Sequence, residues 1–72
     1  MAVPLLSYEY VAQQLWRRKC QFVKDYGHHA LWKTTKIKHH FTVPQEGPDK
    51  QCSAYVFEEI LKEIDTLQGP PD

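Results

Sequence analysis

Apolar residues in the first third of the chain recur at the spacing of an α-helix. Between Pro4 and Tyr26 they fall within one arc when successive residues are turned by about 100°. Pro4 suits the first position of a helix, and Gly27 is a residue type that commonly ends one. The pattern predicts a single amphipathic helix over residues 4–26. Its apolar face consists of Leu5, Tyr8, Val11, Ala12, Leu15, Trp16, Phe22, Val23 and Tyr26.

In the middle of the chain, the spacing at which apolar residues recur shortens to two residues. Here Ile37, His39, Phe41 and Val43 alternate with Lys36, Lys38, His40 and Thr42. Such alternation is typical of a β-strand with one face toward a core. Residues 31–36 and 37–43 could form a hairpin, or a single strand could pair with another chain; both alternatives stay open. The prolines and glycine of residues 44–48 then predict a loop.

The clearest helical pattern lies in the last third of the chain. Asp49 suits an N-cap and Gly69 a stop, which predicts a helix over residues 49–68. Its apolar stripe contains Val56, Phe57, Ile60, Leu61, Ile64 and Leu67. Its other side carries mainly acidic residues, namely Glu58, Glu59, Glu63 and Asp65, together with Lys62.

These elements predict an α+β fold in which two amphipathic helices flank and pack on a short antiparallel β-hairpin or single strand. The 72 residues suffice for one small domain, 1–72, with residues 1–3 and 69–72 expected as loose tails. The core of so small a domain rarely contributes more than about 3–5 kcal/mol. A lone strand would also leave backbone groups unpaired. Both points favour a protein stabilised by a partner or by self-association.

The formal net charge of zero conceals an uneven distribution of charge. Residues 17–40 contain seven lysines or arginines and one acidic residue, Asp25. Residues 45–72 contain seven acidic residues and two lysines. The two segments either neutralise one another within the fold or present surfaces of opposite sign, which would orient a docking partner.

The two cysteines, Cys20 and Cys52, are too few for a disulfide-rich secreted scaffold, although one bridge between them stays open. Cys52 falls in the first turn of the predicted second helix, where the helix dipole lowers a thiol pKa, so it is the more reactive candidate. The sequence has no signal-peptide pattern and no apolar run long enough to span a membrane. We therefore expect an intracellular location, cytoplasmic or nuclear, and no membrane partner.

Two histidine pairs, His28-His29 and His39-His40, bracket part of the basic segment. Neighbouring residues of a strand point to opposite faces, so His39 and His40 cannot both enter one site without a bulge. The spacings of cysteine and histidine match no zinc module, which needs three or four converging ligands. The sequence therefore predicts no metal and no cofactor.

Residues 28–32, HHALW, follow a predicted helix and lead into an extended segment. This segment resembles the histidine motif of pterin carbinolamine dehydratases, in which His-His-Pro-x-Trp follows a helix, enters a strand and is completed by a later histidine. Three residues of the motif agree, and the resemblance spans roughly residues 15–64. It implies an enzyme whose pterin pocket is lined by His28, His29 and Trp32, with His39 or His40 as the later histidine.

A nucleic-acid-binding module is another alternative. Phosphates could be contacted by Arg17, Arg18, Lys33, Lys36 and Lys38, and bases could stack on Trp32 or Phe41. The acidic second helix would repel a polyanion unless it faces away from this surface. No known RNA-binding or helix-turn-helix signature is present in the sequence.

The function that these features favour is a small, non-catalytic protein–protein interaction or adaptor subunit, which binds a protein partner or forms a homo-oligomer. Exposed charges would orient the partner, and aromatic side chains would supply much of the affinity. The candidate partner-binding residues are Tyr10, Trp16, Arg17, Arg18, Trp32, Lys36 and Lys38.

Overall fold

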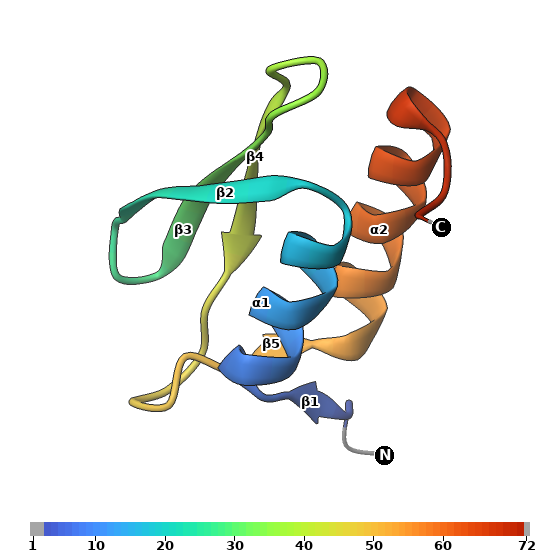
Figure 1. Cartoon of the computed structure of the whole chain (residues 1–72). Coiled ribbons are helices and arrows are strands. Elements are labelled where there is room, and N and C mark those ends of the chain that lie inside the picture. The colour runs from blue at the N-terminus through green and yellow to red at the C-terminus, as the bar shows by residue number, and fades with distance from the viewer. Residues whose placement is uncertain (1–2, 72) are drawn as a thin grey trace.

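A computed structural model describes residues 3–71 of the chain as an α+β fold (Figure 1). Three strands form one antiparallel sheet, two short strands form a second, and two helices complete the described part. The elements in chain order are β1 (Leu5–Leu6), α1 (Tyr8–Arg17), β2 (Cys20–Asp25), β3 (His29–Thr34), β4 (His40–Pro44), β5 (Cys52–Ser53) and α2 (Ala54–Gln68). The predicted fold class, two helices packed on a short antiparallel element, is confirmed.

The larger sheet has the strand order β2–β3–β4, and its register separates two sets of side chains. The rows on one face, here called the inner face, are Cys20–Thr34, Phe22–Trp32–Phe41 and Asp25–Ala30–Val43. The rows on the other face, called the open face, are Gln21–Lys33–His40, Lys24–Leu31–Thr42 and His29–Pro44. Side chains alternate between faces along each strand, apart from a bulge between Phe22 and Lys24 in β2.

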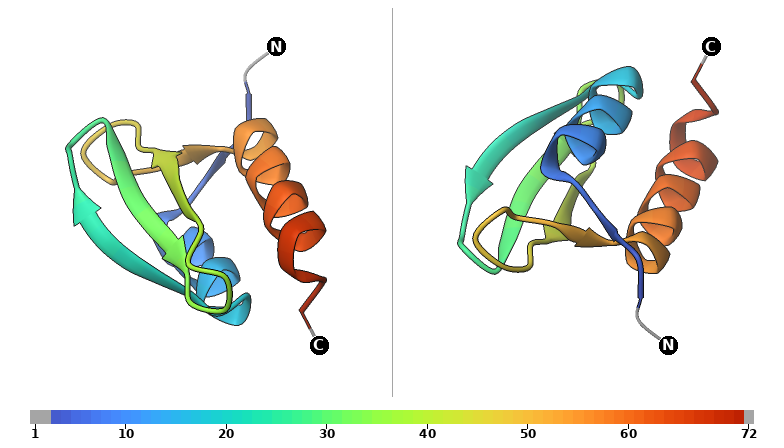
Figure 2. Two further views of the ribbon diagram at one scale, coloured as in Figure 1. Left: turned by 90° about the horizontal axis from the view of Figure 1, so that it is seen from above. Right: turned by 90° about the horizontal axis from the view of Figure 1, so that it is seen from below.

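Both helices cover the inner face of this sheet, as the two views in Figure 2 show. The largest fully buried apolar side chains come from β3 (Trp32), α1 (Leu15) and α2 (Phe57 and Ile64). The buried core as a whole consists of Val11, Ala12, Leu15, Cys20, Ala30, Trp32, Val43, Cys52, Phe57 and Ile64. The fold is therefore a two-layer arrangement in which one face of the sheet has no covering element among the described residues.

The predicted long first helix is wrong, because α1 ends at Arg17 and the following residues form β2. Lys19 adopts a left-handed backbone conformation with φ 62°, which is typical of a residue that terminates a helix. Phe22 and Val23 fit the helical arc, but aromatic and β-branched residues also favour extended structure. Pairing of β2 with β3, a contact between separate segments, decides between the two conformations.

The short β1–β5 pair delays the start of both helices. β1 pairs with β5 in an antiparallel register, so both segments are extended where the sequence predicted helix. The predicted starts at Pro4 and Asp49 are therefore wrong by several residues. Ser7 caps α1 instead: its side-chain oxygen accepts a hydrogen bond from the backbone N–H of Tyr10 at 3.2 Å.

Of the two alternatives left open by the sequence, the structure has the hairpin. β3 pairs with β4, and β2 adds a third strand on the other side of β3. β4 begins at His40, while Ile37 lies in the turn and is 44% exposed. The Thr34 side chain closes this turn by accepting a hydrogen bond from the His39 N–H at 2.9 Å. Each described strand therefore has a partner within the chain.

The end of α2 agrees with the sequence, because the helix stops at Gln68 and Gly69 follows with φ 89°. Residues 69–71 continue without regular structure. The expected loose tails, 1–3 and 69–72, are only partly covered, since residues 1, 2 and 72 lie outside the described residues. Within the described part, no helix has the length and apolar character needed to cross a membrane.

Candidate functional site

The open face of the sheet gathers basic residues without an acidic one. The register places Gln21, Lys24, His29, Leu31, Lys33, His40, Thr42 and Pro44 on it. Most of these residues are exposed, and three of them, Leu31, Lys33 and Pro44, are half-buried. Neither Lys24 nor Lys33 forms an ion pair with another described residue. Two unpaired ammonium groups and two imidazoles therefore belong to one surface.

An aromatic stack lies beside this face, at the turn between β2 and β3. The rings of Tyr26 and His29 stack with their centres 5.1 Å apart and their planes 19° apart. The Lys24 Nζ lies 5.2 Å from the centre of the Tyr26 ring, a cation–π contact. Gly27 makes the turn with φ 92°, and its N–H donates to Asp25 Oδ1 at 2.7 Å. This turn holds two exposed rings and an ammonium group together.

Much of the negative charge lies on α2, away from the open face. Glu58, Glu59 and Glu63 are exposed, whereas Phe57 and Ile64 of the same helix are buried in the core. α2 covers the inner face of the sheet (Figure 2), and because its buried residues face the core, its exposed glutamates lie away from the open face. The uneven charge of the sequence is thus separated in part: two of the seven lysines and arginines of residues 17–40, Lys24 and Lys33, lie on the open face, and the exposed glutamates of α2 lie on another side of the molecule.

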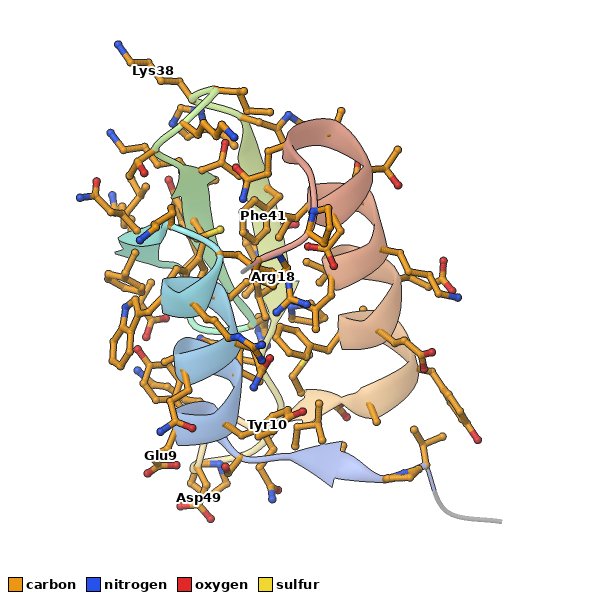
Figure 3. The ribbon with its side chains drawn as sticks, turned by 45° about the vertical axis from the view of Figure 1, so that its right-hand side comes forward. Glu9, Tyr10, Arg18, Lys38, Phe41 and Asp49 are labelled. Carbon is orange, nitrogen blue, oxygen red and sulfur yellow. The ribbon has the colours of Figure 1, made fainter. Side chains whose placement is uncertain are left out.

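The structure brings three of the four predicted basic contact residues to one cleft, and the fourth, Lys38, lies apart from them. The Arg18 guanidinium lies between the helices and pairs with Asp65 through two contacts, Nε–Oδ1 at 2.9 Å and Nη2–Oδ2 at 3.2 Å (Figure 3). Arg18 also lines a cleft at the ends of the helices, together with Arg17 and Lys36. Lys38 projects from the tip of the β3–β4 turn (Figure 3). None of the four belongs to the open face.

The three predicted aromatic anchors differ in accessibility. Trp16 is 60% exposed and Tyr10 45% exposed, although the Tyr10 ring also makes an edge contact with Phe57 at 6.5 Å. Trp32 is only 1% exposed, since it belongs to the inner face. Phe41 lies in the same row and is half-buried. A partner can therefore reach Trp16 and Tyr10, while Trp32 is a core residue.

The histidines are distributed over different parts of the fold. His28 is exposed at the β2–β3 turn, and His29 and His40 lie in different rows of the open face. The His39 Nε2 lies 4.0 Å from a Glu63 carboxylate oxygen of α2. Trp32 points to the inner face, away from His29 and His40. The structure therefore does not bring the residues implied by the pterin dehydratase resemblance to one pocket.

Both cysteines are buried and unbridged. Burial raises the pKa of the Cys20 thiol, and that of the Cys52 thiol, to about 11 in each case. The predicted position of Cys52 in the first turn of the second helix is wrong, because this residue lies in β5 and precedes α2. Both thiols are therefore protonated and poorly nucleophilic at neutral pH.

The described residues, 3–71, contain no metal-binding group of side chains but do form clefts. No three described side chains of histidine, cysteine, aspartate or glutamate lie close enough to hold a metal ion. A cleft of about 630 Å³ lies between the start of α1 and the loop before β5, with Glu9 and Asp49 on its walls (Figure 3). Its one cation, Lys50, is already paired with Asp25. A second cleft, of about 340 Å³, lies at the ends of the two helices.

Two residues, Lys24 on the open face and Tyr26 beside it, were missed as candidates for a binding site. The predicted first helix included both residues and assigned Tyr26 to its apolar face. A usable signal was the turn-forming Gly27 two residues after Asp25, between two segments rich in strand-favouring residues.

Comparison of the chain with known proteins gives no family for it. Neither protein-family models, nor curated proteins, nor solved structures yielded a significant match. Since function resides in sites and not in folds, the chemistry of the surfaces has to identify the function of this chain.

Proposed function

We propose that the chain is a nucleic-acid-binding module whose open sheet face contacts the phosphate backbone. The supporting observation is the separation of charge, with Lys24, Lys33 and two histidines on the open face and the acidic side of α2 turned away from it. A polyanion can approach the basic face without meeting the acidic helix. Lysines that neutralise phosphates release condensed counterions, which is the main sequence-independent contribution to such binding.

The aromatic stack supplies the second element of the proposed interface. Tyr26 is 51% exposed and stacks on His29, and the ammonium group of Lys24 lies beside it. Unpaired bases bind such exposed rings by stacking, largely irrespective of their identity. A single strand that places phosphates along the open face can therefore place a base at the β2–β3 turn. Trp32 and Phe41, the stacking residues expected from the sequence, belong to the inner face and take no part.

The test is the affinity of the chain for fluorescent single-stranded and double-stranded oligonucleotides, measured by anisotropy at several salt concentrations. The variant K24Q/K33Q removes both lysines of the open face. It should weaken binding and lower the slope of log affinity against log salt by about 1.4–1.8, as expected for two lost phosphate contacts. Both side chains lie outside the core, so the fold should be retained.

Lys62 provides a matched control, since it is an exposed lysine on the acidic side of α2. K62Q removes one positive charge from the other side of the molecule, as the single variant K24Q does from the open face, and should leave affinity and salt slope nearly unchanged. Equal losses in K62Q and in K24Q would show attraction to overall charge and contradict a defined interface. Absence of binding to either kind of oligonucleotide at about 50 mM salt, where electrostatic binding is strong, would reject the proposal.

A self-associating adaptor is the second candidate. The unpaired strand that favoured it is replaced by a sheet whose strands pair within the chain. Its remaining support is a group of exposed apolar residues at the β1–β5 end, where Leu5 is 43%, Tyr55 64% and Val56 43% exposed. Sedimentation should detect a dimer that Y55E/V56E disrupts; a monomer at all concentrations would count against this candidate.

A further inference from the structure

The second cleft lies where α1, α2 and the β3–β4 turn meet, apart from the open face of the sheet. Its volume is about 340 Å³, within the range of small-molecule sites. Four basic residues, Arg17, Arg18, Lys19 and Lys36, contribute to its walls, together with the residues that end α2. No acidic residue among those described lines it.

Three of these four cations are not neutralised by a described carboxylate. Arg18 pairs with Asp65, whereas Arg17, Lys19 and Lys36 form no ion pair within residues 3–71. The Lys36 Nζ reaches across the cleft to the backbone carbonyl of Gln68, at 3.4 Å. A cation of the hairpin turn is thereby brought to the end of α2, beside the residues that follow α1.

Lys19 occupies a backbone position that suits glycine better than lysine. Its φ of 62° is left-handed, a conformation that side chains with a Cβ adopt at an energetic cost. Its carbonyl accepts hydrogen bonds from the Thr35 N–H at 2.9 Å and from the Thr35 hydroxyl at 2.7 Å, which fix the segment next to the hairpin. The fold thus requires the left-handed backbone here but makes no use of the lysine side chain. Glycine would suit this helix-terminating position at least as well, so the lysine side chain is free to take part in binding.

We propose that this cleft binds a phosphate group, which is held by the cationic side chains of Arg17, Lys19 and Lys36. An arginine offers paired N–H donors to phosphate oxygens, and lysines add compact positive charges. The negative ends of both helix dipoles point to this region, and part of the basic charge offsets them. Lys36 donates to the carbonyl of the last residue of α2, whereas the side chains of Arg17 and Lys19 form no ion pair with a described residue and are available to a ligand.

The phosphate could belong to a free phosphorylated small molecule or to the end of a nucleic acid strand. Amide chemical shifts followed during titration at constant ionic strength can separate these sources. The probes are inorganic phosphate, pyrophosphate and one short oligonucleotide with and without a 5′-phosphate. Saturable shifts at Lys19, Thr35 and Gly69 are expected with the first two probes. A further gain in affinity from the 5′-phosphate would identify the strand end as the source, and equal affinity of both oligonucleotides would identify the small molecule.

The decisive variant is K19G, which removes the charge and relieves the backbone. Its melting temperature should equal or exceed that of the parent chain. Its affinity for pyrophosphate should fall about threefold to fivefold, the loss expected for one solvent-exposed ionic contact. R17Q/K36Q keeps Lys19 in place and should lower the affinity further.

Lys38 gives a closely matched control. It is also left-handed, with φ 56°, and it also carries a positive charge, but it lies at the hairpin tip and does not line the cleft. K38G should therefore keep the pyrophosphate affinity. Equal losses in K19G and K38G, a lower melting temperature of K19G, or shifts that never saturate would each overturn the proposal. K24Q/K33Q should retain pyrophosphate binding. The experiment therefore distinguishes failure of the proposed nucleic-acid binding by the open face from failure of the proposed phosphate binding by this cleft.

Discussion

The two faces of the three-stranded sheet are built from the same strands but from different kinds of side chain. Along β3, Ala30, Trp32 and Thr34 are buried, while Leu31 and Lys33 between them are half-buried. The inner residues are constrained by the two helices that pack on them. The open face has no covering element among the described residues, so packing does not dictate which side chains it carries.

This difference separates what the fold requires from what function can use. A core position accepts few side chains, because interiors are close-packed and volume changes are costly. A lysine or histidine on the open face contributes little to packing, so its presence needs another explanation. The alternation along a single strand therefore distinguishes structural from functional residues, and the variants below test that distinction.

The largest expected effect comes from removing Trp32 of the inner face. W32A should destabilise the fold by about 3–5 kcal/mol, the usual cost of deleting a buried aromatic side chain. Most of a small domain's stability would be lost. Urea denaturation followed by circular dichroism measures the change. K33A, one residue along on the open face, is the control and should stay within about 0.5 kcal/mol of the parent chain; a comparable loss in K33A would remove the distinction between the faces.

A smaller loss of stability is expected when the polar contact between the two helices that cover the inner face is removed. R18M keeps much of the apolar stem of Arg18 but removes its paired contact with Asp65, whose side chain is 28% exposed against 11% for Arg18. Because the pair is partly buried and doubly hydrogen-bonded, we expect a loss of about 1–3 kcal/mol.

A double-mutant cycle with D65N tests whether this loss comes from the contact itself. Arg18 also donates to the side chain of Gln14 at 3.1 Å, so the single variant removes more than one interaction. The cycle isolates the coupling between Arg18 and Asp65. A coupling near zero would mean that the Arg18–Asp65 pair adds nothing to the stability of the helix contact, although Gln68 Nε2 still donates to the Arg18 carbonyl at 2.6 Å.

Elements with one dominant period could be predicted from the sequence. The stripe containing Phe57 and Ile64 identified α2, and Gly69 marked its end, because a helix of that length imposes a clear pattern. The alternation around Phe41 and Val43 likewise identified β4, although its start was placed too early. These features depend on local spacing, which a single sequence contains.

The second strand and the open face could not be predicted in this way. Phe22, Val23 and Tyr26 fit a helical arc as well as a strand, and the choice depends on pairing with β3. The bulge after Phe22 then sets which face Lys24 occupies. Lys33 was foreseen as a phosphate contact, but its assembly with Lys24 and the aromatic stack depends on register, which is a contact between distant segments.

The smallest effect on stability is expected from replacing Asp25, at the rim of the inner face. The adjacent residues Lys24 and Asp25 point to opposite faces of the sheet. Asp25 accepts hydrogen bonds from Lys50, from the Gly27 N–H and from Gln45. These contacts lower the pKa of the Asp25 carboxyl to about 2; the hydrogen bond from Lys50 has the largest influence, followed by that from the Gly27 N–H. An unfolded aspartate has a pKa of about 3.9, so the folded state binds its proton less tightly.

A depressed pKa fixes the sign of the pH dependence. The stabilisation from Asp25 is complete above the unfolded pKa and is lost as the pH falls through the folded value of about 2. Thermal melts should therefore show D25N less stable than the parent chain at pH 5–7, and the difference should shrink as the pH falls from about 4 to about 2. K50Q should raise the Asp25 pKa, which carboxyl NMR titration measures. K24Q, which alters the neighbouring open-face residue, should leave that pKa nearly unchanged; a similar rise in both variants would mean that Asp25 senses overall charge and not its inner-rim contacts.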